Sequence, residues 1–149
     1  MAKPSFINLW NSYPPYSSDH PPACDGPWDN QCAIRMSIAL NGEHTIKVNS
    51  STYTEPKCAH GHARGAESLA NWLWRHYLGR PTILTGSAED RRTLQQKTGI
   101  IFFKDCFRRY GESTEARSGD HIDVWRRGQT GSYDDPAHAS RQVWFWELT

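Results

Sequence analysis

The stretch Gly99-Ile-Ile-Phe-Phe103 marks the place where the hydrophobic pattern of this 149-residue chain changes. Before it, apolar residues recur every three or four positions, a spacing that predicts amphipathic helices. From it onward, short runs of β-branched and aromatic residues stand between turn residues, as is typical of strands. These runs are Ile100–Phe103, His121–Trp125 and Gln142–Trp146. Helices followed by strands predict an α+β fold, in which N-terminal helices pack on a C-terminal antiparallel sheet.

Four segments before Gly99 carry a helical pattern: residues 4–13, residues 32 to about 41, residues 65–78 and residues 87–97. The second segment follows Asp29 and Asn30, which are favoured N-cap types, and the fourth opens with a capping box at Ser87. Five prolines interrupt residues 13–28, so we expect an ordered loop or arm there. Residues 43–64 look irregular. The length suits one domain, so residues 1–149 are expected to fold as a unit.

The overall charge excludes some classes of partner. A net charge of +1 gives no electrostatic case for binding nucleic acid or an anionic membrane.

No apolar run is long enough to span a bilayer. The first residues, Met1-Ala-Lys-Pro-Ser-Phe6, lack the apolar core of a secretory signal, so we expect the chain to be made and folded in the cytoplasm.

Cys32 is the candidate nucleophile, because it stands at the start of a predicted helix. The free amides and the dipole of a helix N-terminus favour a thiolate and can also stabilise an oxyanion. The simpler interpretation is that Cys32 is a small buried apolar residue. If Cys32 is catalytic, at most one disulfide can form within the chain among Cys24, Cys58 and Cys106, and the sequence does not indicate which two would pair.

His121 is the candidate base, because it begins a predicted strand on which His121, Asp123 and Trp125 share one face. A third group should orient its imidazole. Asp134 and Asp135 follow the next turn, and either could return beside the ring. Asp123 looks too far for direct contact, since same-face neighbours on a strand are about 6.6 Å apart.

Two other classes of function compete with an enzyme. Cys58-Ala-His-Gly-His62 offers three possible zinc ligands, although a fourth has no obvious place in the sequence. The second alternative is a peptide-binding module in which Tyr13, Tyr16 and Trp28 of the proline-rich arm line a groove. In an enzyme, the same arm would form a wall of the substrate cleft, with Trp28 as a substrate contact. We expect neither a metal nor another cofactor.

Several blocks resemble the type VI secretion amidase effectors of the fourth family, which are NlpC/P60-like, papain-type cysteine peptidases. The blocks are Asn30-Gln-Cys-Ala-Ile-Arg-Met-Ser37, Lys57-Cys-Ala-His-Gly-His-Ala-Arg-Gly-Ala-Glu-Ser68, Gly119-Asp-His-Ile-Asp-Val-Trp125 and Val143-Trp-Phe-Trp-Glu-Leu148. They cover most of the chain in the expected order. The most specific feature is the first block combined with a late Gly-x-His strand.

The resemblance implies a peptidoglycan amidase that hydrolyses the bond between D-glutamate and meso-diaminopimelate in stem peptides. It implies delivery by a type VI secretion apparatus into the periplasm of rival cells, and a periplasmic immunity protein that protects the producing cell. Cys32 matches the family nucleophile and His121 the family base. The third member of the family triad is an aspartate shortly after the histidine strand, for which we choose Asp134 over Asp135.

Overall fold

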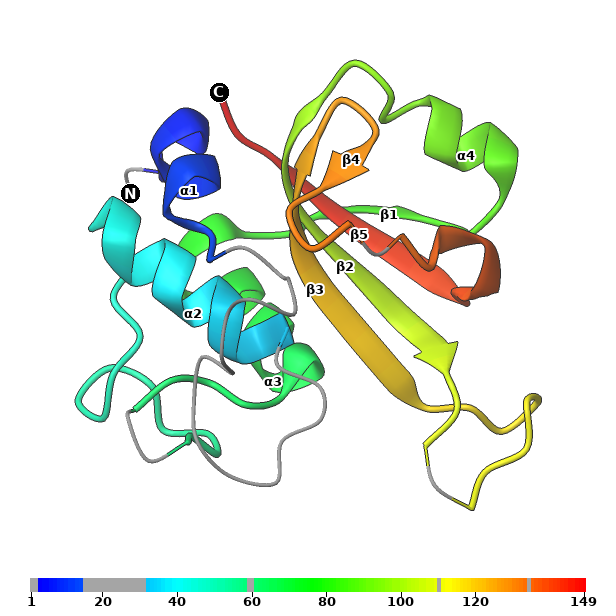
Figure 1. The fold of residues 1–149 in the computed structure, drawn as a ribbon, viewed down its shortest axis with the longest axis horizontal. Helices are drawn as coiled ribbons and strands as arrows, with labels where there is room; N and C mark the ends of the chain where they lie inside the picture. Colours follow the sequence, from blue (N-terminus) through cyan, green and yellow to red (C-terminus); the bar gives the residue numbers. More distant parts are fainter. Residues whose placement is uncertain (1–2, 15–31, 59–60, 110, 134) are drawn as a thin grey trace.

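The computed structural model describes residues 3–14, 32–58, 61–109, 111–133 and 135–149 (Figure 1). Three helices come first, and five strands then form one antiparallel sheet in the order β1-β5-β2-β3-β4. The helices are α1 (Phe6–Ser12), α2 (Cys32–Glu43) and α3 (Ala66–Leu73), and the strands are β1 (Thr82–Leu84), β2 (Thr98–Phe107), β3 (Gly119–Arg126), β4 (Gln129–Thr130) and β5 (Gln142–Glu147). The predicted α+β class is confirmed.

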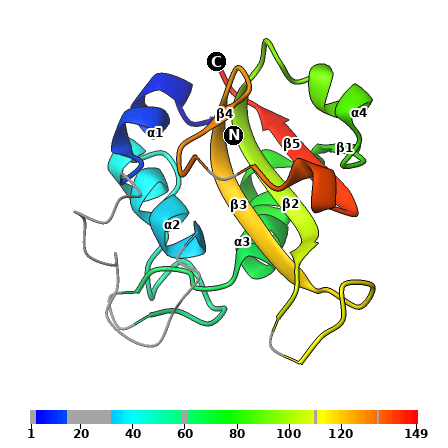
Figure 2. The same cartoon turned by 45° about the vertical axis from the view of Figure 1, so that its right-hand side comes forward.

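Both faces of the sheet are covered, as the two views show (Figures 1 and 2). Helices α1, α2 and α3 lie against one face, where Ile100 and Phe102 of β2 and Ile122 and Val124 of β3 join the main core. On the other face a smaller core includes Trp125 of β3. Over this face lie α4 (Ala88–Arg92) and a short 3-10 turn (Ala137–Ala139), drawn in orange-red before β5. The alternation of side chains along β3 therefore follows the predicted pattern.

Some boundaries differ from the sequence expectation. α3 continues through one π-helical turn (Trp74–Leu78) and stops at Gly79, whose φ of 74° suits glycine. The fourth helix was predicted to reach Lys97, but α4 ends at Arg92 because the chain then turns inward to bury Leu94. Half of the predicted capping box forms, since the amide of Asp90 donates to the Ser87 hydroxyl at 3.1 Å. The Asp90 carboxylate accepts the amide of Thr85 at 2.8 Å rather than that of Ser87. Strands β1 and β4 are too short to show alternation and were not predicted.

The pairing of β3 with β2 and β4 determines which residues lie beside His121 and the strand that carries it. His121 lies opposite Phe103 of β2, and Trp125 lies opposite Thr130 of β4. Because β4 is so short, the chain leaves it at once and brings Gly131 and Ser132 back alongside β3. Among the described residues, no helix is long and apolar enough to cross a bilayer.

Candidate active site

Cys32 is the first residue of α2 and is 94% buried, with a relative exposure of 6%. Its thiol is hydrogen-bonded to the imidazole of His121. The helix therefore presents the cysteine to β3 from its amino end, where the first backbone amides have no partner within the helix. The fold thus brings Cys32 and His121 into contact, in agreement with the prediction.

The imidazole of His121 is held from two sides. Its ring stacks on Phe103, with centroids 5.9 Å apart and planes at 19°. Its Nε2 lies 2.8 Å from Oδ2 of Asp123 and 3.3 Å from the hydroxyl of Ser132. Because these groups occupy Nε2, Nδ1 is the ring nitrogen that remains for the Cys32 thiol.

Asp123 is completely buried and its carboxylate is saturated with donors. Its Oδ1 accepts the amides of Val124 at 2.8 Å and Gly131 at 2.9 Å. Its Oδ2 accepts the hydroxyl of Ser132 as well as the contact from His121. These donors replace the hydrogen bonds to water that the carboxylate loses on burial.

The expectation that Asp123 is too far from His121 was wrong. His121 and Asp123 have the backbone spacing of same-face neighbours on a strand. The turn after β4 donates hydrogen bonds to the Asp123 carboxylate, and the two side chains lean toward each other until they are in contact. Asp135 instead accepts a hydrogen bond from Arg91 Nε at 2.8 Å. Ser132, rather than Asp135, comes back to the ring. Asp134 and Trp28 lie outside the described residues, so their assignments stay predictions.

The surroundings change the proton affinity of the imidazole. Burial alone would lower the pKa of His121, but hydrogen bonds to Asp123 and Cys32, together with their negative charges, raise this pKa to about 10. The ring is therefore an imidazolium at neutral pH. A cation against the sulfur is the arrangement that stabilises a thiolate.

Tyr13, which follows α1, closes the site on another side. Its ring packs on Gly131, where an added Cβ would stand only 2.9 Å from Tyr13 Cδ1, so the turn needs glycine there. Burial, and then the negative charges of Asp123 and Cys32, raise the pKa of Tyr13 well above its usual value. The phenol is thus neutral. Sequence patterns had placed Tyr13 only on a helix face or in a binding arm, and they contained no signal for Ser132.

The possible zinc site at Cys58-Ala-His-Gly-His62 has no thiolate to offer as a sulfur ligand. Cys58 is disulfide-bonded, and zinc binds cysteine as a thiolate. Its sulfur lies 3.7 Å from Nδ1 of His62, while His60 lies outside the described residues. Within the described parts of the chain, no three His, Cys, Asp or Glu side chains gather in a way that could hold a metal ion.

Comparison with known proteins now identifies the chain. Residues 28–146 match the family model described as type VI secretion system (T6SS), amidase effector protein 4, or Tae4. The chain belongs to this family. The Tae4 match includes Cys32 and His121 together with Asp123 and Ser132. A search of curated protein sequences found no significant match.

Solved structures of Tae4 proteins share the fold. The Tae4–Tai4 effector–immunity complex from Salmonella Typhimurium matches with a TM-score of 0.72 at 20% identity, covering 99% of this chain and 100% of that one. The corresponding complex from Enterobacter cloacae matches with a TM-score of 0.70 at 18% identity, with the same coverage. Tae4 alone from Enterobacter cloacae matches with a TM-score of 0.72 at 17% identity, covering 99% of this chain and 98% of that one.

Proposed function

We propose that this Tae4 protein is a cysteine amidase that hydrolyses the bond between D-glutamate and meso-diaminopimelate in peptidoglycan stem peptides. The observation that carries the proposal is the buried chain of contacts from Cys32 through His121 to Asp123. A nucleophile bonded to a base that is bonded to an orienting acid is the arrangement expected for acyl transfer. Membership in an amidase effector family supports the same reaction class.

The proposed reaction has two halves. The Cys32 thiolate attacks the carbonyl carbon of the D-glutamate side-chain amide, and the first amides of α2 stabilise the oxyanion. The His121 imidazolium gives its proton to the departing amine of diaminopimelate, which leaves a thioester on Cys32. His121 then takes a proton from water, the hydroxide attacks the thioester, and the free acid and thiolate are released. Asp123 and Ser132 orient His121 throughout, so we propose Asp123 as the third triad member.

Three further properties follow from the same proposal. The helix-presented cysteine facing a histidine strand supports an NlpC/P60-like, papain-type architecture. Several structural neighbours are complexes of Tae4 with Tai4, which supports a cognate periplasmic immunity protein for this chain. As a type VI effector that cuts peptidoglycan, it acts in the periplasm of the target cell.

The decisive experiment is to incubate purified protein with disaccharide tetrapeptide fragments of peptidoglycan and to identify the products by mass. We expect two products: disaccharide-L-Ala-D-Glu and diaminopimelyl-D-Ala. Each cut adds one water, so the two masses sum to the substrate mass plus water. Cleavage between any other pair of residues would contradict the proposed bond, and an intact substrate would contradict the activity.

Replacing Asp123 with asparagine is expected to lower kcat/KM by about 100-fold, because the imidazole loses the charge that orients it. The pH profile should change as well. The raised pKa of His121 keeps the imidazolium up to pH about 10, so wild-type activity should fall as pH rises through that value. Without the Asp123 charge this pKa falls, and the alkaline loss of activity should move to lower pH.

The matched control is Asp135→Asn, which removes the partner of Arg91 on the other side of the turn. This variant should keep both the wild-type rate and the wild-type pH profile. If Asp135→Asn moves the alkaline limb and Asp123→Asn does not, Asp135 is the orienting acid after all.

A further inference from the structure

The turn after β4 is tightly enclosed. The amide of Gly131 donates to Oδ1 of Asp123 at 2.9 Å, and the next residue, Ser132, donates its hydroxyl to Oδ2. A Cβ added to Gly131 would stand 2.6 Å from Cγ2 of Val124 and 2.9 Å from Cδ1 of Tyr13, which is closer than such atoms approach in real proteins. Val124 belongs to β3 itself, so Tyr13 is the side chain that packs on this turn from outside the sheet.

Tyr13 is fixed in place by the helix before it. It directly follows α1, and its amide donates to the carbonyl of Trp10 at 3.2 Å. At the other end of α1, the amide of Phe6 donates to the carbonyl of Thr149 at 3.2 Å, and the side chains of Phe6 and Leu9 are buried in the main core. The helix lies beside α2 in both views (Figures 1 and 2). The Tyr13 side chain, with a relative exposure of 8%, is therefore held within the packed interior.

The hydroxyl of Tyr13 adds little to this contact. It lies against the Ser132 hydroxyl, yet among the described residues it has no hydrogen-bond partner of ordinary geometry. Its charged neighbours are Asp123, Cys32 and, with the opposite sign, Arg35. Burial is the main cause of the raised pKa of the phenol, which stays neutral and contributes no charge of its own. What Tyr13 offers to the turn is the packing of its ring.

We propose that Tyr13 is a positioning residue of the amidase: by packing on Gly131, its ring holds the turn that fixes Asp123 against His121. The inference rests on the proposed function, to which it adds a residue that acts through Asp123. Without the ring, Gly131 is free to move outward, and its amide and the Ser132 hydroxyl leave the carboxylate. The imidazole then loses both its orientation and part of the negative charge that favours its protonated form.

The test compares Tyr13→Ala with Tyr13→Phe in the hydrolysis of the diaminopimelate stem tetrapeptide. Tyr13→Ala should lower kcat by about 10-fold or more and leave KM close to the wild-type value, because a small misplacement of a catalytic group is costly. Its activity should also begin to fall at lower pH than that of the wild type, since Asp123 favours the His121 imidazolium less. Tyr13→Phe keeps the ring and should keep both the rate and the pH profile.

Two further measurements make the test independent of one variant and of the substrate. Gly131→Ala displaces the same turn while Tyr13 and α1 stay intact, so its alkaline loss of activity should move in the same direction. Alkylation of Cys32 by iodoacetamide at neutral pH, located by peptide mass, needs no peptidoglycan. It should be slower in Tyr13→Ala than in the wild type, because a less populated imidazolium stabilises the thiolate less.

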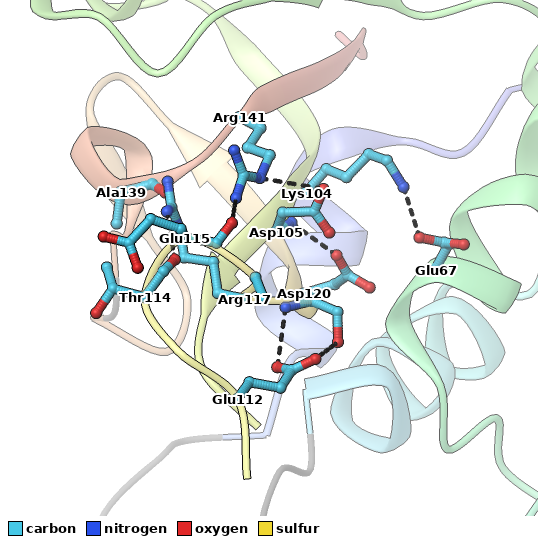
Figure 3. Close-up of polar contacts among 12 residues, drawn as sticks. Glu67, Lys104, Asp105, Glu112, Thr114, Glu115, Arg117, Asp120, Ala139 and Arg141 are labelled. Atoms are coloured by element: carbon cyan, nitrogen blue, oxygen red, sulfur yellow. Dashed lines mark hydrogen bonds and ion pairs between the residues drawn. The ribbon is translucent and has the colours of Figure 1, made fainter. Parts of the chain in front are cut away.

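Two controls separate positioning from general loosening of the structure. Leu9→Val weakens the packing of α1, but Leu9 is not among the side chains that crowd Gly131, so the urea midpoint should fall while the pH profile stays. Glu112→Ala loosens the loop between β2 and β3 (residues 108–118), where Figure 3 shows Glu112. Its carboxylate accepts the amides of Arg109 at 2.7 Å and Ser118 at 3.1 Å. This variant should keep the wild-type kcat and pH profile.

Three results would overturn the proposal. The first is a loss of activity in Tyr13→Phe equal to that in Tyr13→Ala, which would assign the effect to the hydroxyl. The second is a wild-type pH profile in both Tyr13→Ala and Gly131→Ala. The third is a shift in Leu9→Val as large as that in Tyr13→Ala. A wild type that leaves the peptide intact, while Tyr13→Ala still slows alkylation of Cys32, would refute the proposed function and support the positioning role.

Discussion

Replacing Cys32 with alanine is expected to abolish hydrolysis of stem peptides, with a fall in kcat of about four orders of magnitude or more. The reason is that the thioester cannot form without the sulfur, and neither His121 nor the α2 amides can replace it. The fold should survive, because only the sulfur atom is lost from a buried position at the start of α2. Product release followed by mass, with circular dichroism as the check on folding, measures both parts.

The control for this variant is Cys106→Ala. Cys106 is also buried and also carries a thiol, but it belongs to the smaller core that contains Trp125. Its loss should leave the rate close to wild type. His121→Ala should resemble Cys32→Ala, since both remove a member of the dyad. Full activity of Cys32→Ala would end the proposal that Cys32 is the nucleophile of an amidase. Loss of activity in Cys106→Ala but not in Cys32→Ala would indicate that Cys106 is the nucleophile instead.

The wild-type protein is expected to lyse a Gram-negative host when a signal peptide directs it to the periplasm, and to be tolerated when it stays in the cytoplasm. Peptidoglycan lies in the periplasm, and cutting its stem peptides removes the cross-links that resist turgor. Colony counts and culture density after induction measure the effect, which should reduce viable cells by several orders of magnitude in the periplasmic case alone.

The Cys32→Ala form directed to the same compartment serves as the control and should be harmless. Lysis by this inactive form would indicate that the protein damages the cell without catalysis, for example by disrupting a membrane. Equal toxicity of the wild type in the cytoplasm would indicate an intracellular target, and the cell-wall assignment would then fall.

The local parts of the structure could be predicted because their signals are local. The helix that begins at Cys32 follows from its apolar spacing, and the capping bond at Ser87 follows from residues three positions apart. The faces of β3 follow from alternation alone, since successive side chains of a strand point to opposite sides. The predicted boundaries that were wrong, such as the C-terminal end of α4, depend on tertiary packing, because α4 ends where the chain turns to bury Leu94.

The sequence alone determined the class of fold, the cysteine at a helix start and the histidine on a strand. Only the tertiary structure decided which acid holds that histidine. Spacing along β3 argued against Asp123, yet the turn after β4 brings the amide of Gly131 and the hydroxyl of Ser132 onto its carboxylate and fixes it against the imidazole. Those contacts join residues eight and nine positions apart through a two-residue strand that leaves no pattern in the sequence. The partner of a buried charge is set by which donors the fold brings to it, and that depends on how β3, β4 and the following turn pack together.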